Sequence, residues 1–235
     1  MRAIQIRVSG PWAHFRKPET NNNPLTHDFL TKTALIGLMG AVLGQERRVW
    51  SPFVPQLSSD LRYGIQVEKP VRKESWGFTL RAAFSPWNPK DEKSPRPFEF
   101  LRDPQFRVVI ALHDERSAEI FDAFARFVRE EMACYTPTLG LQPCVAHLAW
   151  IGEMAAEAKN GEFSTSGFVR RDQMGTQNLT QPNFRLGFEK IPTAQTSEWW
   201  NKLEDYREVV YPSFGGVAVG NGEYFQINGE NWCLL

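Results

Sequence analysis

The order of strand-like and helix-like segments constrains the fold of this chain more than any other feature of its sequence. Alternating apolar residues, as at Ile4, Ile6 and Val8, predict strands, and apolar residues three and four positions apart predict helices. These patterns predict strands at residues 1–10, 63–67, 76–84, 105–112 and 145–151, and helices at 26–44 and 115–132. Thr26 or Asp28 could cap the first helix, and Gly44 would end it in the left-handed conformation.

The order of strand, helix, two or three strands, helix and strand is typical of the split βαβ pattern of ferredoxin-like α+β folds. Polar residues and prolines predict loops at 9–28, 50–60, 85–97 and 156–183. The rest predicts a short strand at 184–188, a short helix at 197–208 and a terminal meander with turns at Asn221-Gly222 and Asn228-Gly229. We interpret the second half of the chain as an appended lobe.

Gly37 and Gly40 lie inside the first predicted helix, where each costs roughly 1 kcal/mol of helix propensity relative to alanine. This cost indicates that something packs unusually close to the helix backbone. The close neighbour could be the protein's own sheet, or it could be a ligand or a partner.

The chain has no net charge, because 27 basic side chains balance 27 acidic ones among its 235 residues. A neutral chain exerts little long-range attraction on polyanions, which would count against nucleic acid as a partner. The charges are nevertheless separated along the sequence: residues 1–100 hold 15 basic and 9 acidic side chains, and residues 101–235 hold 12 and 18. The basic half could face a polyanion while the acidic half meets a basic protein, or each half could simply carry its own solvated charges.

No cofactor and no metal ion is expected. The three cysteines and four histidines form no Cys-x-x-Cys or His-x-x-x-His pair, and the sequence has neither a nucleotide-binding glycine loop nor a Gly-x-Ser-x-Gly elbow. The longest apolar run, residues 34–44, falls short of the roughly 18 residues that suggest a membrane span. The N-terminal segment has no apolar signal core, so we expect a cytoplasmic protein without a membrane partner.

Binding to a single RNA strand requires cations for the phosphates and aromatic rings on which bases stack. The candidate residues are Phe15, Arg16 and Lys17 after the first strand; Thr26, His27 and Lys32 at the start of the first helix; Arg47 and Arg48 after it; Lys69, Arg72, Lys73 and Trp76 on a basic hairpin; and Arg170 and Arg171 in the polar segment. The helix dipole would favour anions at the second group. Any one group alone could be ordinary surface, and it is their expected clustering around one sheet edge that favours RNA.

A metal-independent ribonuclease is the alternative, because such an enzyme needs a general base, an acid and a cation for the phosphorane charge. His113, with Tyr63 or Tyr135, could supply the first two groups. A protein-interaction module that binds no RNA is a third hypothesis.

Two stretches of the sequence resemble a known family. Residues 15–18 (FRKP) with 26–44 (THDFLTKTALIGLMGAVLG), and residues 135–140 (YTPTLG) with Cys144 and Ala146, are similar to two patches of CRISPR-associated protein family five. This family belongs to the RAMP superfamily and provides a subunit of type I Cascade complexes. The two patches and the order of elements extend to about residue 150.

The resemblance implies a ferredoxin-like RAMP palm in residues 1–152, with a basic thumb hairpin inserted around 62–107, and a smaller β-rich lobe in 153–235 that ends in the hairpin meander. It implies a non-catalytic subunit that binds and caps the five-prime handle of crRNA in antiviral defence. The implied partners are the Cascade backbone subunit and large subunit, with target DNA met only indirectly.

Some family members also cut the precursor RNA with a Tyr, Lys and His constellation. In this sequence Gln45, Glu46, Arg47 and Arg48 stand where a tyrosine would directly follow the first helix. This departure favours a purely binding role over cleavage.

Overall fold

The computed structural model describes residues 1–20, 22–81, 93–177, 185–193, 206–212 and 214–235. The helices are α1 (Lys32–Val42), α2 (Arg47–Trp50), α3 (Val54–Asp60) and α4 (Ala118–Arg129), with 3₁₀ turns at Ser51–Phe53, Glu115–Ser117 and Arg171–Gln173. The strands are β1 (Arg2–Ser9), β2 (Trp12–Ala13), β3 (Leu61–Val67), β4 (Lys73–Arg81), β5 (Lys93–Arg102), β6 (Gln105–Leu112), β7 (His147–Thr165), β8 (Val169–Arg170), β9 (Leu186–Pro192), β10 (Tyr206–Pro212), β11 (Ala218–Ile227) and β12 (Glu230–Trp232).

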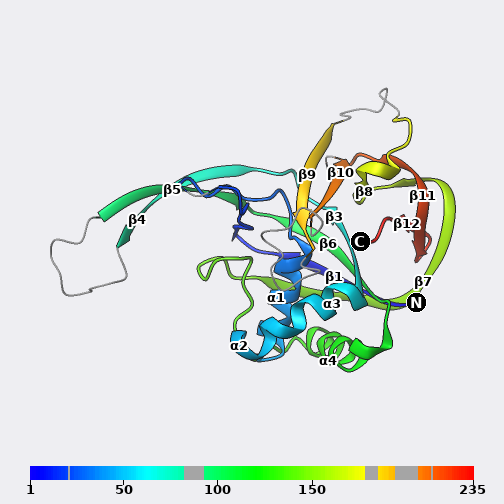
Figure 1. Cartoon of the computed structure of the whole chain (residues 1–235), viewed down its shortest axis with the longest axis horizontal. Coiled ribbons are helices and arrows are strands. Elements are labelled where there is room, and N and C mark those ends of the chain that lie inside the picture. The colour runs from blue at the N-terminus through cyan, green and yellow to red at the C-terminus, as the bar shows by residue number, and fades with distance from the viewer. Residues whose placement is uncertain (21, 82–92, 178–184, 194–205, 213) are drawn as a thin grey trace.

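Six strands form one curled antiparallel sheet in the order β12-β11-β7-β1-β6-β3 (Figure 1). Because side chains alternate across a strand, β1 contributes to both faces of this sheet. Ile4 and Ile6 pack in the same core as apolar residues of α1 and α4. Ala3 belongs instead to a second core, which the C-terminal hairpin builds with Phe225 and Trp232. The chain is therefore a mixed α/β protein, and the predicted mixture of helices and strands is confirmed.

Local patterns located several elements correctly. The strand predicted at 105–112 is β6, and the first strand and both long helices are present with shorter bounds. The first helix is capped by Thr31, whose Oγ1 accepts a hydrogen bond from the Ala34 N–H at 3.3 Å, so the predicted start at Thr26 or Asp28 is wrong. Gly44, with φ +71°, lies just beyond the helix end as predicted.

The loop predicted at residues 50–60 is wrong, because α2, a 3₁₀ turn and α3 occupy this segment. Pro52 and Pro55 misled the prediction. Both stand in the first turn of a helical segment, where the missing N–H of proline is not required for an intrahelical hydrogen bond.

The hairpin of β4 and β5 extends away from the body of the molecule (Figure 1). It forms a three-stranded sheet with β2, which pairs with β5 only at Leu101 and Arg102. Residues 93–97, expected in an exposed loop, are therefore strand, whereas 85–92 lie outside the described residues. Pro95 and Pro97 fit there because the edge of β5 opposite β4 is unpaired at those positions.

The C-terminal part contains the largest departures from the predicted elements. β7 is one strand of 19 residues that pairs first with β1 and then with β11, so the loop predicted at 156–183 is wrong as far as 165. It is wrong again at 169–173, where β8 and a 3₁₀ turn lie. The strand also runs through residue 152, at which we expected one lobe to give way to another, and that division stays a prediction.

Of the two Asn-Gly turns that were predicted, one is present. Asn228 and Gly229, with φ values of +51° and +79°, form the two-residue turn between β11 and β12. Asn221 and Gly222 instead lie within β11. The strand expected at 184–188 is found as β9 from residue 186, and Arg185 precedes it. The helix expected at 197–208 is contradicted at 206–208, which begin β10. Residues 184 and 197–205 lie outside the described part of the chain.

No helix in the described ranges is long and apolar enough to cross a membrane.

The close neighbour of the first helix is Trp50 of the same chain. Its Nε1–H donates a hydrogen bond to the Ile36 carbonyl at 2.9 Å, and a Cβ added at Gly40 would lie 2.8 Å from the indole ring. A Cβ added at Gly37 would meet nothing within 4 Å. Close packing therefore explains Gly40 and leaves Gly37 without this constraint.

Substituting the two glycines should have opposite effects. Gly40→Ala is expected to lower the free energy of unfolding by about 1–3 kcal/mol, because the new methyl group displaces Trp50. Gly37→Ala should raise it by roughly 0.5–1 kcal/mol through helix propensity. Urea denaturation of both variants beside the wild type measures this, and equal effects would contradict the assigned role of Trp50.

Candidate nucleic-acid interface

Residues from four distant parts of the chain meet where the segment after β1 passes the root of the β4–β5 hairpin. We call this group the junction; it consists of Lys17, His27, Asp28, Lys73, Glu99 and Glu189. Two hydrogen bonds bring Lys17 and His27 together: the backbone N–H of Phe15 donates to the Thr26 side-chain Oγ1 at 2.9 Å, and the backbone N–H of His27 donates to the Phe15 carbonyl at 2.8 Å. The segment between β1 and α1 is thus folded back on itself.

The buried carboxylate of Glu189, on β9, lies at the centre of the junction. Its Oε1 accepts hydrogen bonds from Lys17 Nζ at 3.0 Å and from the Asp28 N–H at 3.1 Å, and its Oε2 lies 2.8 Å from His27 Nδ1. Burial alone would raise the pKa of Glu189, but the hydrogen bonds and charges of His27 and Lys17 outweigh it and lower the pKa to about 2. The carboxylate is therefore held in its ionised form.

Lys73, the first residue of β4, is held in the same way. Its Nζ lies 2.7 Å from Asp28 Oδ1 and 3.1 Å from Glu99 Oε1, and it donates to the Thr26 carbonyl at 3.1 Å. Burial opposes the charge of this ammonium group, but the two carboxylates prevail and raise the pKa of Lys73. Both carboxylates are satisfied by other groups too, since the Thr26 N–H donates to Glu99 and the Tyr211 hydroxyl donates to Asp28.

Four of the predicted contacts have buried side chains, so the expectation that these side chains touch RNA is corrected. Phe15 is 3% exposed and packs against Phe106 in the core, and its ring offers no face to a base. Thr26 and His27 are buried in the junction. These residues organise the interface from inside.

Lys32 is the fourth buried residue. Its Nζ donates to the carbonyl oxygens of Ser58 at 2.6 Å and Leu235 at 3.0 Å, so it ties α1 to α3 and to the last described residue. Burial, followed by the charges of Arg62 and Arg207, lowers the pKa of Lys32 to about 7. An enclosed amine that readily loses its charge is a poor partner for phosphate.

The remaining predicted cations divide into paired and unpaired groups. Lys17 and Lys73 are paired within the junction, Lys69 pairs with Asp103 at 2.9 Å, Arg170 with Asp172 at 2.6 Å and Arg171 with Glu208 at 2.7 Å. Among the described residues, the side chains of Arg47, Arg48 and Arg72 have no ion pair, and Arg16 makes only a 3.4 Å hydrogen bond to the Thr20 carbonyl. These four exposed guanidinium groups remain available to an anion.

Trp76 keeps its predicted character as an exposed ring. It is 40% exposed on β4 and packs edge-on against Trp12 of β2, with ring centroids 4.3 Å apart. Phe78, Phe98 and Phe100 extend this aromatic cluster along the hairpin. The ring of Trp76 is therefore held by Trp12 and Phe100 while part of its surface stays open to solvent, and an accessible aromatic ring is what base stacking requires.

Sequence reasoning missed the three carboxylates of the junction. Asp28, Glu99 and Glu189 lie far apart in the chain, and no local pattern distinguishes them from other surface acids. Their positions decide which of the predicted cations are neutralised.

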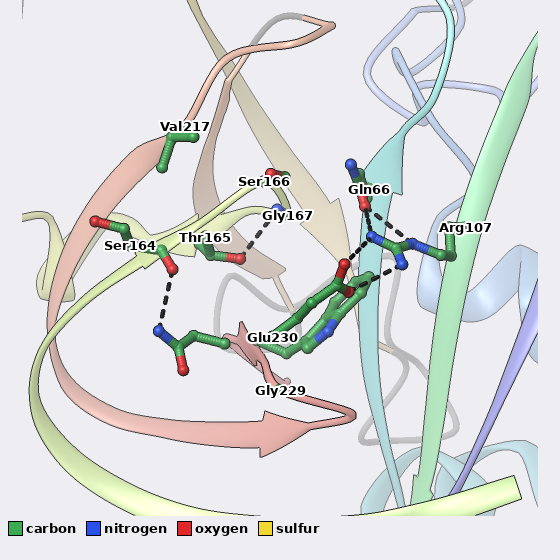
Figure 2. Close-up of a pocket in the computed structure, with 11 residues that line it drawn as sticks. Gln66, Arg107, Ser164, Thr165, Ser166, Gly167, Val217, Gly229 and Glu230 are labelled. Atoms are coloured by element: carbon green, nitrogen blue, oxygen red, sulfur yellow. Dashed lines mark hydrogen bonds and ion pairs between the residues drawn. The ribbon is translucent and has the colours of Figure 1, made fainter.

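A separate pocket of about 240 Å³ lies between β3, β6, the end of β7 and the C-terminal hairpin (Figure 2). Its cation is Arg107, whose guanidinium donates to Gln66 Oε1 at 3.0 Å and pairs with Glu230 at 2.9 Å. Ser164, Thr165 and Gly167 form the facing wall. Because Arg107 is already neutralised, this pocket has little to offer a phosphate.

Within the described residues no three His, Cys, Asp or Glu side chains gather as metal ligands would.

Comparison with protein families identifies the chain. The family model described as CRISPR-associated protein (Cas_Cas5) matches residues 3–198. The chain belongs to the Cas5 family. No curated protein sequence gives a significant match to this Cas5 chain.

Solved structures share the Cas5 fold at low sequence identity. A CRISPR protein from Archaeoglobus fulgidus has a TM-score of 0.62 and 13% identity over 99% of this chain and 98% of that one. A chain of a CRISPR RNA-guided surveillance complex has a TM-score of 0.52 and 14% identity over 90% of each chain. A chain of the Type III-B Cmr-beta complex bound to cognate target RNA and AMPPnP has a TM-score of 0.51 and 7% identity, over 92% of this chain and 86% of that one.

Glu189→Gln should remove a pH-dependent part of the stability of this Cas5 protein. Its folded pKa of about 2 lies below the ordinary 4.5, so the ionised carboxylate stabilises the fold above about pH 4.5, and this contribution is lost as the pH falls toward 2. We expect the wild type to exceed the variant by about 3 kcal/mol in unfolding free energy at pH 7, with the difference shrinking below pH 4.5.

Glu208→Gln serves as the control, because its pair with Arg171 is exposed and should contribute little. Urea unfolding of the three proteins between pH 7 and pH 3 makes the comparison. A difference between wild type and Glu189→Gln that does not vary with pH would contradict the assignment.

Proposed function

We propose that this Cas5 protein is a non-catalytic, RNA-binding subunit of a CRISPR effector complex that holds the five-prime handle of the guide RNA. Family membership supports an effector subunit, and the structures of similar fold include chains of an RNA-guided surveillance complex and of a complex bound to target RNA. The type I assignment, the handle and the contacts with the backbone and large subunits belong to this proposal.

The same proposal includes a ferredoxin-like palm with a thumb. The strand order β7-β1-β6-β3, with α1 between β1 and β3 and α4 between β6 and β7, supports the palm. The long β4–β5 hairpin, inserted between β3 and β6, supports the thumb (Figure 1).

The observation that carries the proposal is the set of unpaired cations beside an exposed aromatic ring. Arg16 lies in a backbone bridge with Thr26, and the carbonyl of Thr26 accepts a hydrogen bond from Lys73, the neighbour of Arg72. The geometry therefore brings Arg16 and Arg72 to the same region, at the root of the hairpin that carries Trp76. Cations for phosphates next to a ring for a base are what a single RNA strand requires.

The ribonuclease alternative loses one of its candidate groups. The Tyr63 side chain is fully buried, donates its hydroxyl proton to the Leu30 carbonyl, and has a pKa well above the ordinary value because of burial. The other two candidates are His113, which follows β6, and Tyr135. The backbone N–H of His113 donates to the Asp60 carbonyl at the end of α3, and the backbone N–H of Tyr135 donates to the Ala41 carbonyl in α1. Because Tyr63 is removed and the backbones of His113 and Tyr135 are bonded to different helices, α3 and α1, we put forward binding without cleavage.

The Arg16→Ala, Arg72→Ala double variant tests RNA binding. We expect weaker binding to repeat-derived single-stranded RNA and a salt dependence that is shallower by roughly 0.7 for each lost phosphate contact. Fluorescence anisotropy over a series of salt concentrations measures both quantities.

The matched control is the double variant Arg126→Ala, Lys159→Ala. It also removes two positive charges, one from α4 and one from the second half of β7. A double variant at Arg16 and Arg72 that binds like this control would remove both arginines from the interface. Incubating the wild type with the same RNA in chelator tests cleavage, and shortened RNA would replace the non-catalytic role with the ribonuclease alternative.

A further inference from the structure

A hollow of about 500 Å³ lies at the root of the β4–β5 hairpin, and nothing in the sequence patterns pointed to it. We call it the root pocket. Its principal lining residues are Val67 at the end of β3, Val71 between β3 and β4, Arg185 just before β9 and Leu186 at its start, Tyr211 of β10 and Phe214 after it. This volume is within the usual range of small-ligand pockets.

The walls of the root pocket combine an exposed ring with a fixed one. Phe214 is 54% exposed and Val71 is 37% exposed, although both belong to a concave surface. Tyr211 is 6% exposed, its hydroxyl is bonded to Asp28, and a Cβ added at Gly187 would overlap its ring. The pocket therefore has a rigid inner wall and an aromatic side chain at its rim.

The charge around the root pocket is positive. Arg185 lines it, Arg72 directly follows Val71, and neither side chain has an ion pair or hydrogen bond to any described residue. Among the described residues that line the pocket there is no carboxylate. The nearby acids Asp28 and Glu189 are already neutralised within the junction by Lys73, Lys17 and their hydrogen bonds.

We infer that the root pocket binds one nucleotide of a single-stranded RNA, with its base stacked on Phe214 and its phosphate at Arg185 or Arg72. The occupant must present a flat apolar group and an anion together, and a nucleotide carries both. An aliphatic side chain of a protein neighbour would fill the apolar walls but leave both arginines without a partner. This inference rests on the proposed RNA-binding function and assigns to it a particular pocket.

A double-mutant cycle tests the inference: protein variants are combined with modified RNAs, and the RNA affinity of each combination is measured. The probes are single-stranded RNAs of the repeat-derived sequence, each with one abasic position, and the variants are Phe214→Ala, Phe214→Leu and Phe214→Trp. We expect Phe214→Ala to weaken binding of unmodified RNA by about 5- to 150-fold, the range of one base stacked on an aromatic ring. One abasic position should cause a similar loss that Phe214→Ala does not increase.

The shape of the side chain separates stacking from simple apolar contact. Phe214→Trp should keep the wild-type affinity and Phe214→Leu should lose it, whereas equal rescue by leucine would overturn base stacking. Phe53→Ala is the control, because Phe53 is 44% exposed in the 3₁₀ turn before α3 and does not line the root pocket. It should bind RNA like the wild type.

Failure of the inference is distinguishable from failure of the proposed function. If the wild type binds RNA and Phe214→Ala binds it equally well, the root pocket is not a nucleotide site and the proposed function stands. If the wild type binds none of the RNAs, both are overturned. In the assembled effector complex, p-benzoylphenylalanine placed at Val71 should cross-link to RNA, and a cross-link to a protein subunit instead would assign the pocket to that subunit.

Discussion

The buried carboxylate of Glu189 is the interaction on which the arrangement of this surface depends. An unpaired ion in such a position would cost several kcal/mol, so the fold is stable only when its partners are in place. These partners come from the segment between β1 and α1: Lys17, His27 and the backbone of Asp28. Strand β9, in the second half of the chain, thereby fixes the conformation of the segment between β1 and α1, which lies more than 160 residues earlier.

The same ion pairs decide which of the predicted cations are free to bind an anion. Lys73 and Lys17 satisfy carboxylates in the junction, and their release toward a phosphate would leave Asp28 or Glu189 without a counter-ion. Among the described residues, the side chains of Arg72 and Arg16 have no carboxylate partner, so binding an anion would leave no buried acid unpaired. This difference explains how a chain with equal numbers of acidic and basic side chains can still expose cations at this place: the lysines of the junction are paired with its carboxylates, and the unpaired guanidinium groups of Arg16 and Arg72 lie beside it.

An element of this fold could be predicted from the sequence where one of its faces is buried, and was missed where most of its side chains are exposed. β6 and α4 follow from local burial, because a strand or helix with one covered face shows that face in its sequence. The second half of β7 has mostly exposed side chains from 157 to 162 although it pairs with β11, so no apolar alternation marks it as a strand. Its polar sequence was therefore interpreted as a loop.

The candidate interface was predictable as a set of segments but not as a set of contacts. The 15–17 segment, the 26–28 segment and the start of the hairpin do meet, as their predicted clustering required. Whether each side chain points outward depends on partners that are remote in sequence. Lys32 is drawn inward by the carbonyl of Leu235, and Phe15 by Phe106, and neither partner is marked by any feature near these residues.

The direction of the β4–β5 hairpin also follows from the junction. A hairpin of two strands is only marginally stable by itself, so this one depends on its root. There, Lys73 of β4 and Glu99 of β5 both bond to the backbone of Thr26, while Trp12 of β2 packs against Trp76. The segment that carries Arg16 is therefore the same one that orients the hairpin. The backbone segments that carry Arg16, Arg72 and Trp76 are thus held in a fixed relation to one another, and under the proposed function this preorganisation would lower the entropy cost of binding RNA.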